Sequence, residues 1–217
     1  MTTDPTPGRW MQTFCGRKFY FSFFDGEDGS GPDSRGLAQL DIRELAHACS
    51  NICRFGGHSR WLSVAEHCVR ASWLVPLRYR LVTLIHDLGE GITGDRIHPL
   101  VDYARDSPID SLAGRIQRAC YYRWAPDFYS PIARDLVGDS KKIVKHADLE
   151  MLALEARDVL PGGPVERWAD IELPPPPPRM RIRKGWKPKV ARARFLDHFF
   201  AYSGASYENR YFDSEEL

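Results

Sequence analysis

The spacing of apolar residues is the feature that most restricts how this chain can fold. Residues 42–49 carry apolar side chains at positions i, i+3, i+4 and i+7, and residues 78–90 carry a stripe of leucine and isoleucine. Such spacing places apolar side chains on one face of an amphipathic helix. The sequence therefore favours an all-α fold in which helices bury their apolar faces against one another.

Helix boundaries can be predicted from the residues that flank these segments. Asp41 followed by Glu44, and Ser63 followed by Glu66, have the spacing of capping boxes at helix starts. Further helices are expected at three segments, 108–124, 139–160 and 190–203. "PGGP" at 161–164 should end the second of these, since proline cannot continue a helix. We expect a bundle of five to six main helices with irregular N- and C-terminal extensions.

The chain divides into three predicted regions. Residues 1–36 form an N-terminal arm, in which "RKFYFSFF" is a short strand or a packed segment and 26–36 is a loop. Residues 37–163 form the helical core. Residues 164–217 hold a proline-rich extended linker, a basic segment and a C-terminal helix that packs on the core.

Composition predicts a cytoplasmic protein. Hydrophobic residues make up 43% and charged residues 27%, and the net charge is +1, so no global field attracts DNA or a membrane. No apolar stretch approaches the roughly 20 residues that cross a bilayer, and the N-terminus lacks the pattern of a secretory signal. The 5 cysteines are an odd number without framework spacing, which favours reduced thiols.

The segment "LIHDLGEGITGD", residues 84–95, combines apolar residues with a dense group of ionisable ones. If 78–90 is one helix, His86, Asp87 and Glu90 lie within an arc of about 100°, opposite the apolar stripe. Charged side chains are rarely buried unless they are paired. The cluster must therefore be solvated, mutually paired or bound to a ligand.

His67 in "SVAEH", the doublet His86–Asp87 and Asp148 in "KHAD" resemble the H…HD…D pattern of the HD superfamily of metal-dependent phosphohydrolases. The segments "CRFGGHSRWLSVAEH" and "HDLGEGITGD" are similar to bacterial HD-type 5′-deoxynucleotidases and phage HD-type dATP triphosphohydrolases. This resemblance implies an HD-domain helical bundle with His67, His86, Asp87 and Asp148 as metal ligands.

Two imidazoles and two carboxylates suit Zn, Co, Mn, Fe or Ni, and a second metal such as Mg is left open. Such an ion acts as a Lewis acid and activates water. The implied reaction is attack of water on the α-phosphorus of a deoxynucleotide, which gives deoxynucleoside and phosphate. The alternatives are a dATP or dNTP triphosphohydrolase and an HD protein that binds nucleotide or nucleic acid without catalysis.

The resemblance also implies roles for residues around the ligands. Glu90 and Asp95 are catalytic candidates for orienting or deprotonating water and for handling the leaving oxygen, with the division between them open. The phosphate or substrate contacts implied are Arg54 and Lys145, and His58 is a further candidate because it follows two glycines.

Two aromatic residues, Phe55 and Trp61, are candidates for a wall against the base or sugar. The chain departs from the phage enzymes where a lysine is expected, because Val101 and Asp102 stand there; Arg96, His98 or Arg105 are possible substitutes. Whether the substrate is a nucleoside monophosphate or a triphosphate is therefore left open.

The segment 179–194 has eight basic residues, a tryptophan and no acid. A solvated face or an oligomer contact accounts for it more simply than nucleic-acid binding. Partners are thus a small deoxynucleotide and, by resemblance, further copies of the chain in a homo-oligomer.

Overall fold

In a computed structural model, the described residues are 9–24, 34–128, 134–161 and 173–205, with the side chains of 98–99 and 134–139 also outside the description. The strands are β1 (Trp10–Gln12) and β2 (Lys18–Tyr20). The short 3₁₀ helices are η1 (Phe21–Phe24), η2 (Phe55–Gly57), η3 (Leu77–Tyr79) and η4 (Pro126–Phe128). The α-helices are α1 (Ser34–Gln39), α2 (Ile42–Asn51), α3 (Val64–Ser72), α4 (Arg80–Leu84), α5 (Glu90–Thr93), α6 (His98–Tyr103), α7 (Pro108–Trp124), α8 (Arg134–Asp158) and α9 (Pro188–Ser203).

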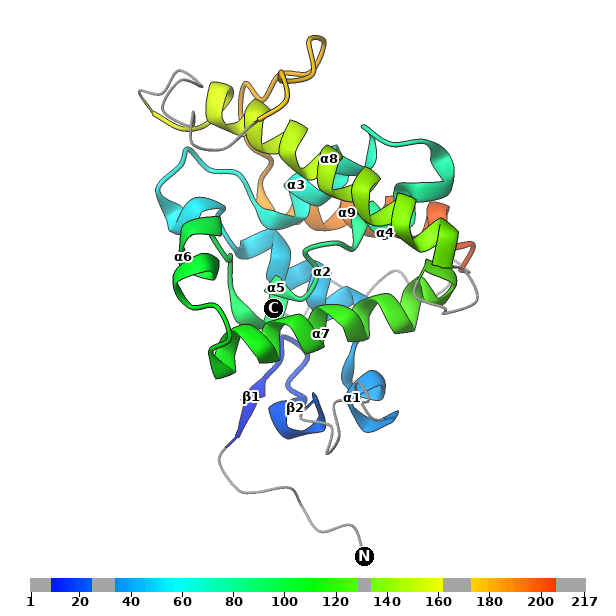
Figure 1. Cartoon of the computed structure of the whole chain (residues 1–217). Coiled ribbons are helices and arrows are strands. Elements are labelled where there is room, and N and C mark those ends of the chain that lie inside the picture. Colours follow the sequence, from blue (N-terminus) through cyan, green and yellow to red (C-terminus); the bar gives the residue numbers. More distant parts are fainter. Residues whose placement is uncertain (1–8, 25–33, 129–133, 162–172, 206–217) are drawn as a thin grey trace, which may run out of the picture.

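The architecture is a helical bundle, as the apolar spacing predicts (Figure 1). The sheet is limited to an antiparallel hairpin in which Trp10 pairs with Tyr20 and Met11 with Phe19. Phe19 is buried, so the aromatic run of the N-terminal arm is both a strand and a packed segment. The predicted loop 26–36 falls mostly outside the described residues, but its last three residues begin α1.

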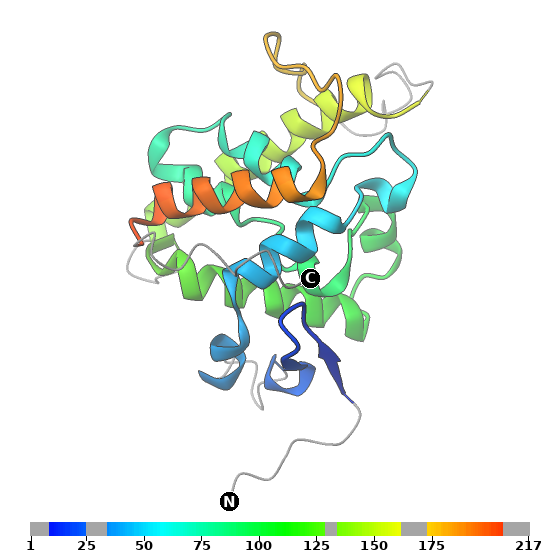
Figure 2. The same cartoon turned by 180° about the vertical axis from the view of Figure 1, so that it is seen from behind.

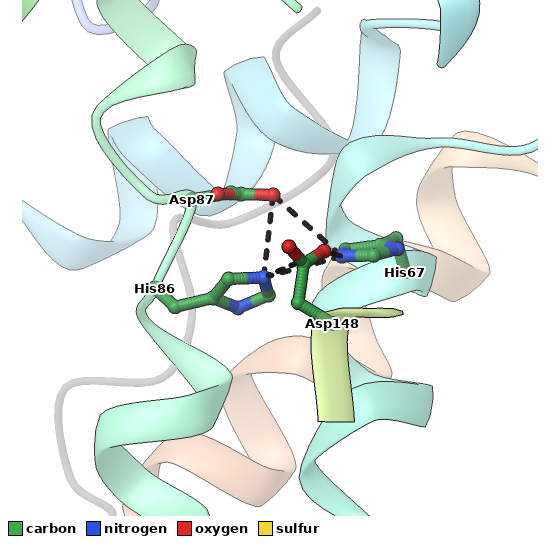
Figure 3. Close-up of side chains that lie close together, drawn as sticks. All are labelled: His67, His86, Asp87 and Asp148. Atoms are coloured by element: carbon green, nitrogen blue, oxygen red, sulfur yellow. Dashed lines mark hydrogen bonds and ion pairs between the residues drawn. The ribbon is translucent and has the colours of Figure 1, made fainter. Parts of the chain in front are cut away.

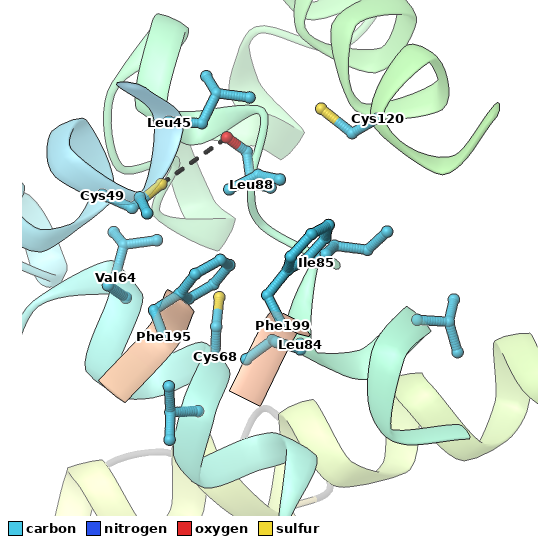
Figure 4. Close-up of a cluster of buried hydrophobic side chains, with 14 of the residues drawn as sticks. Leu45, Cys49, Val64, Cys68, Leu84, Ile85, Leu88, Cys120, Phe195 and Phe199 are labelled. Carbon is cyan, nitrogen blue, oxygen red and sulfur yellow. Dashed lines mark hydrogen bonds between the residues drawn. The ribbon is translucent and has the colours of Figure 1, made fainter. Parts of the chain in front are cut away.

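Helix α9 crosses the back of the bundle, where it packs against α2, α3 and α4 (Figure 2). Its residues Phe195 and Phe199 lie in the main buried cluster together with Val64, Cys68 and Leu84 (Figure 4). A second, smaller cluster joins α3 to α8 and to the segment before α9. All 5 cysteines are free thiols. Within the described residues, none of the helices is both long and apolar enough to cross a bilayer.

The helix starts differ in how far they match the predicted caps. Ser63 accepts a hydrogen bond from the Glu66 amide at 3.2 Å and so caps α3, but the Glu66 carboxylate binds Arg70 and the Trp186 amide instead of completing a capping box. Asp41 instead accepts from the amide of Arg43 at 2.9 Å, and Glu44 turns away from the helix start toward the N-terminal hairpin. Both helices therefore have the predicted N-cap residue, but neither has a complete capping box, because other contacts engage the side chains of Glu44 and Glu66.

The predicted helix over 78–90 is also wrong, because α4 ends at Leu84 and α5 begins at Glu90. In a continuous helix the amide of Gly89 would donate to the carbonyl of Ile85. Here the side chain of Gln117 separates them: its Nε2 donates to the Ile85 carbonyl and its Oε1 accepts from the Gly89 amide, both at 2.8 Å. His86 and Asp87 consequently lie in turns. The prediction that His86, Asp87 and Glu90 share one face of a single helix is therefore wrong.

Candidate metal centre

Four side chains from three separate elements meet at one point (Figure 3). His67 comes from α3, His86 and Asp87 from the turns after α4, and Asp148 from α8. One ligand atom from each lies within 4.8 Å of all the others. The Nε2 atoms of His67 and His86 are 3.2 Å apart, and Asp87 Oδ2 is 3.3 Å from that of His86. This group could bind a metal ion.

The orientation of both imidazoles fits a cation. His67 Nδ1 lies 2.6 Å from a carboxylate oxygen of Glu155, and His86 Nδ1 lies 2.6 Å from the carbonyl of Thr83. Both partners are acceptors, so each Nδ1 carries the proton and each Nε2 of a neutral ring presents a lone pair to the cluster. Two lone pairs and two carboxylates facing one another attract a positive charge.

The pKa shifts of these residues result from the same close contacts between histidines and carboxylates. Burial and Arg54 act to lower the pKa of His67, but Glu155 and Asp148 outweigh them and raise it to about 9. Burial alone would raise the pKa of Asp148, yet its contacts with His67 and His86 hold that pKa well below its ordinary value. Without a metal, the histidines of the cluster therefore hold protons more strongly than usual, and a bound divalent ion would displace those protons.

Glu155 is a functional residue that sequence reasoning missed. It lies on α8, is fully buried, and accepts from Arg54 Nη2 at 3.2 Å in addition to His67. Its position seven residues after Asp148 puts both on one face of the helix. The available signal was an acid inside the apolar run "MLALEA", where a carboxylate needs a buried partner.

Arg54, predicted to contact phosphate, is largely buried and bridges three carboxylates. Its guanidinium lies 3.4 Å from Asp87, 3.7 Å from Asp95 and 3.2 Å from Glu155. It thus links the loop at η2 to the metal ligands and to α8. In this arrangement Arg54 holds the site together.

The two catalytic candidates lie in different environments. Asp95 Oδ2 accepts from the amide of Gly56 at 2.9 Å, which ties its carboxylate to η2. Glu90 is 9% exposed; its Oε1 accepts from the Arg96 amide at 3.0 Å, and Oε2 has no hydrogen-bond partner among the described residues. Burial, and then the charge of Asp87, raise the pKa of Glu90 to about 8.

Two small cavities meet at His86. One of about 180 Å³ is lined by Asp87, Glu90 and Gln117, among others. The other, of about 160 Å³, is lined by Asp148 and by apolar side chains of α4, α7 and α8. Both cavities therefore adjoin the cluster at His86.

Of the other residues predicted to contact substrate, Lys145 lies beside the cluster, whereas His58, Phe55 and Trp61 are not among the described residues that line its two cavities. Lys145 Nζ lies 3.1 Å from Asp148 Oδ2 at the edge of the apolar cavity. His58 is exposed. Phe55 has a left-handed backbone conformation with φ 59°, and its ring lies beside the Arg54 guanidinium. The indole of Trp61 donates to the carbonyl of Trp186 at 2.7 Å.

Comparison with known proteins gives relatives without an assigned activity. The chain is 33% identical over 156 residues to the uncharacterized protein YfdR of Escherichia coli K12, a match that covers 69% of this chain and 72% of YfdR. It is 27% identical over 161 residues to an uncharacterized protein of Rhodobacter capsulatus, which covers 64% of this chain and 79% of that protein. No family model matches.

Proposed function

We propose a function for this chain, which belongs to the same family as the Escherichia coli protein YfdR: it is an HD-type metal-dependent phosphohydrolase that cleaves the 5′ phosphoester of a deoxynucleotide. The observation that carries the proposal is the convergence of His67, His86, Asp87 and Asp148 beside Glu90, a buried acid that lines an adjoining cavity and has one oxygen without a hydrogen-bond partner among the described residues. A structural ion pair would not need an unpartnered carboxyl oxygen next to it.

When bound at these four residues, a divalent transition metal supplies Lewis acidity to the phosphoryl group. The chain's own residues do the rest. Glu155 holds His67 in the orientation that presents Nε2. Lys145, half-exposed beside Asp148, attracts a phosphate oxygen as a point charge.

Glu90 is the proton carrier in this proposal. Its free Oε2 accepts a proton from the attacking water as the new oxygen–phosphorus bond forms. The bond from phosphorus to the 5′ oxygen breaks, and that oxygen takes the proton that Glu90 has accepted, so that it leaves as the deoxynucleoside hydroxyl and Glu90 returns to its starting state. The other product is inorganic phosphate.

The positions of the cations favour a monophosphate over a triphosphate. Two of the candidate substitutes for the missing lysine are already paired, Arg96 with Asp110 and Arg105 with Asp102. The side chain of His98 lies outside the described residues. Among the described residues, the further cations beside the cluster are then mainly Lys141 and Lys145, which line the cavity at Asp148, and we take these as enough for one phosphate.

The test is an end-product assay. Purified protein, supplied in turn with Zn²⁺, Co²⁺ and Mn²⁺, is incubated with each dNMP and dNTP, and products are separated by chromatography. We expect deoxynucleoside and phosphate from at least one dNMP, and loss of turnover in His86→Ala. Triphosphate release would point to the dNTP alternative. Absence of both products with a stoichiometrically bound metal would favour a binding protein and reject the proposal.

A further inference from the structure

A groove of about 450 Å³ lies away from the metal ligands, between the loop after η2, the end of α8 and the segment before α9. Figure 2 shows that segment, in orange, running past the end of α8. Val159 and Ile182 form its apolar floor and are almost fully buried. Trp61 forms an aromatic wall, with 38% of its surface exposed.

The walls of the groove are held in place by specific contacts. The Trp61 indole donates to the carbonyl of Trp186, whose own amide donates to Glu66 at 2.5 Å. A side chain at Gly185 would meet the Trp61 carbonyl oxygen at 1.9 Å, so only glycine allows this approach. The backbone amide of Arg60 donates a hydrogen bond to the Val159 carbonyl at 3.0 Å. The groove is therefore formed before any ligand arrives.

The rim carries positive charge, and none of the described residues that line it is acidic. Its basic residues are Arg60, Arg183, Lys184 and Lys187. All four are exposed, and within the described residues no side-chain hydrogen bond or ion pair involves them. On a chain with a net charge of only +1, this is a strong local excess.

From these features we infer that the groove binds single-stranded nucleic acid, with a base stacked on Trp61 and the phosphates held by the four cations. Because its N–H is already used by Trp186, the Trp61 indole offers a ligand its ring surface rather than a hydrogen bond. A preformed apolar groove with an aromatic face and a cationic rim suits unpaired bases on a phosphate backbone. A duplex keeps its bases stacked inside and would not reach the ring.

The test is fluorescence anisotropy of a labelled oligo-dT with the full-length protein at several salt concentrations. We expect saturable binding that weakens with salt; four released counterions correspond to a slope of about −3 in log K against log salt. Trp61→Ala should weaken binding by about 5- to 150-fold, the range for loss of one stacked base.

Two charge-reversal variants keep the test independent of folding. Lys184→Glu removes a rim cation that makes no described side-chain contact and should weaken binding, whereas Lys142→Glu changes the net charge equally on the exposed face of α8 and should not. Equal weakening by both variants, equal affinity for a duplex, or displacement by polyglutamate as effective as by unlabelled oligo-dT would overturn the inference. None of these outcomes depends on phosphohydrolase activity.

Discussion

Two buried glutamates near the candidate metal ligands have contrasting surroundings. Both carboxylate oxygens of Glu155 are engaged, one with His67 and one with Arg54. Burial acts to raise the pKa of Glu155, but these cations outweigh it and lower that pKa. Glu90 has one oxygen bound to a backbone amide and one without a described partner, and its pKa is raised to about 8.

This contrast separates a residue that fixes geometry from one that is available to react. A fully engaged carboxylate cannot exchange partners without leaving a buried charge unpaired, which is costly. A buried carboxyl group that lines a cavity and has an oxygen without a described partner is available to bind water or substrate. Substitutions at Glu90 and Glu155 test this distinction directly, and we expect them to have larger effects than changes at the turn after α4 or at the buried Glu44 pair.

Replacing Glu90 with glutamine should have the largest effect. The amide keeps the acceptor for the Arg96 amide but cannot carry a proton, so we expect turnover to fall by about 10²- to 10⁴-fold with bound metal unchanged. Phosphate release and metal content by elemental analysis measure the two quantities. Glu44→Gln removes a buried acid far from the ligands and serves as the control; unchanged turnover in Glu90→Gln would remove its catalytic role.

Glu155→Gln should act on metal affinity first. The glutamine oxygen still accepts from His67, but the negative charge that supports this imidazole is lost, so we expect about 10- to 100-fold weaker binding. Titration with Zn²⁺ or Co²⁺ gives the dissociation constant, and excess metal should restore much of the turnover. Glu150→Gln on the same helix is the matched control. Full affinity in Glu155→Gln would mean that Glu155 serves α8 packing alone.

Gly89→Ala tests the turn that carries His86, Asp87 and Glu90. The added Cβ would lie 3.1 Å from Gln117 Oε1 and 3.2 Å from its backbone nitrogen, so we expect the free energy of unfolding to fall by about 1–3 kcal/mol. Gly114→Ala on α7 meets only a flexible arginine end at 3.6 Å and should stabilise by about 0.4–1 kcal/mol. Denaturant unfolding measures both, and the same sign for the two variants would contradict this explanation of the break.

Arg17→Met should show the smallest effect. Its partner Glu44 is buried, but the Arg17 side chain is 45% exposed, so solvent weakens the attraction between the two charges. Burial acts to raise the pKa of Glu44, but hydrogen bonds from Arg17 and Thr13 lower it below 4.5. The pair therefore stabilises the fold above that pH and ceases to do so as pH falls through the lowered pKa. We expect a loss of about 0.2–1 kcal/mol at neutral pH that vanishes in strong acid, measured by urea unfolding. A loss independent of pH would indicate packing instead of charge.

Features encoded by neighbouring residues could be predicted from the sequence. The helix over 108–124 matches α7 at both ends, because Ser107 caps its start and its apolar spacing is regular. The start of α3 follows from Ser63 and Glu66 in the same way. The four ligand positions came from an ordered motif, and the structure brings them together.

Features that depend on distant partners could not be predicted. The break after Leu84 requires Gln117, which lies 28 residues after Gly89 in the sequence. Glu155 reaches His67 across 88 residues. The sequence predicts Arg54 as a phosphate contact but gives no sign of the three carboxylates that surround its guanidinium in the structure. In each case a tertiary contact decides what the local pattern leaves open.

The location of α9 has a consequence for biosynthesis. Its phenylalanines fill the space between α2, α3 and α4, although it follows all four residues of the candidate metal centre in the chain. A ribosome has therefore translated all four ligand codons before the wall behind them can assemble. Until synthesis passes residue 203, the nascent protein exposes the apolar sides of these three helices, and we expect it to depend on chaperones during that interval.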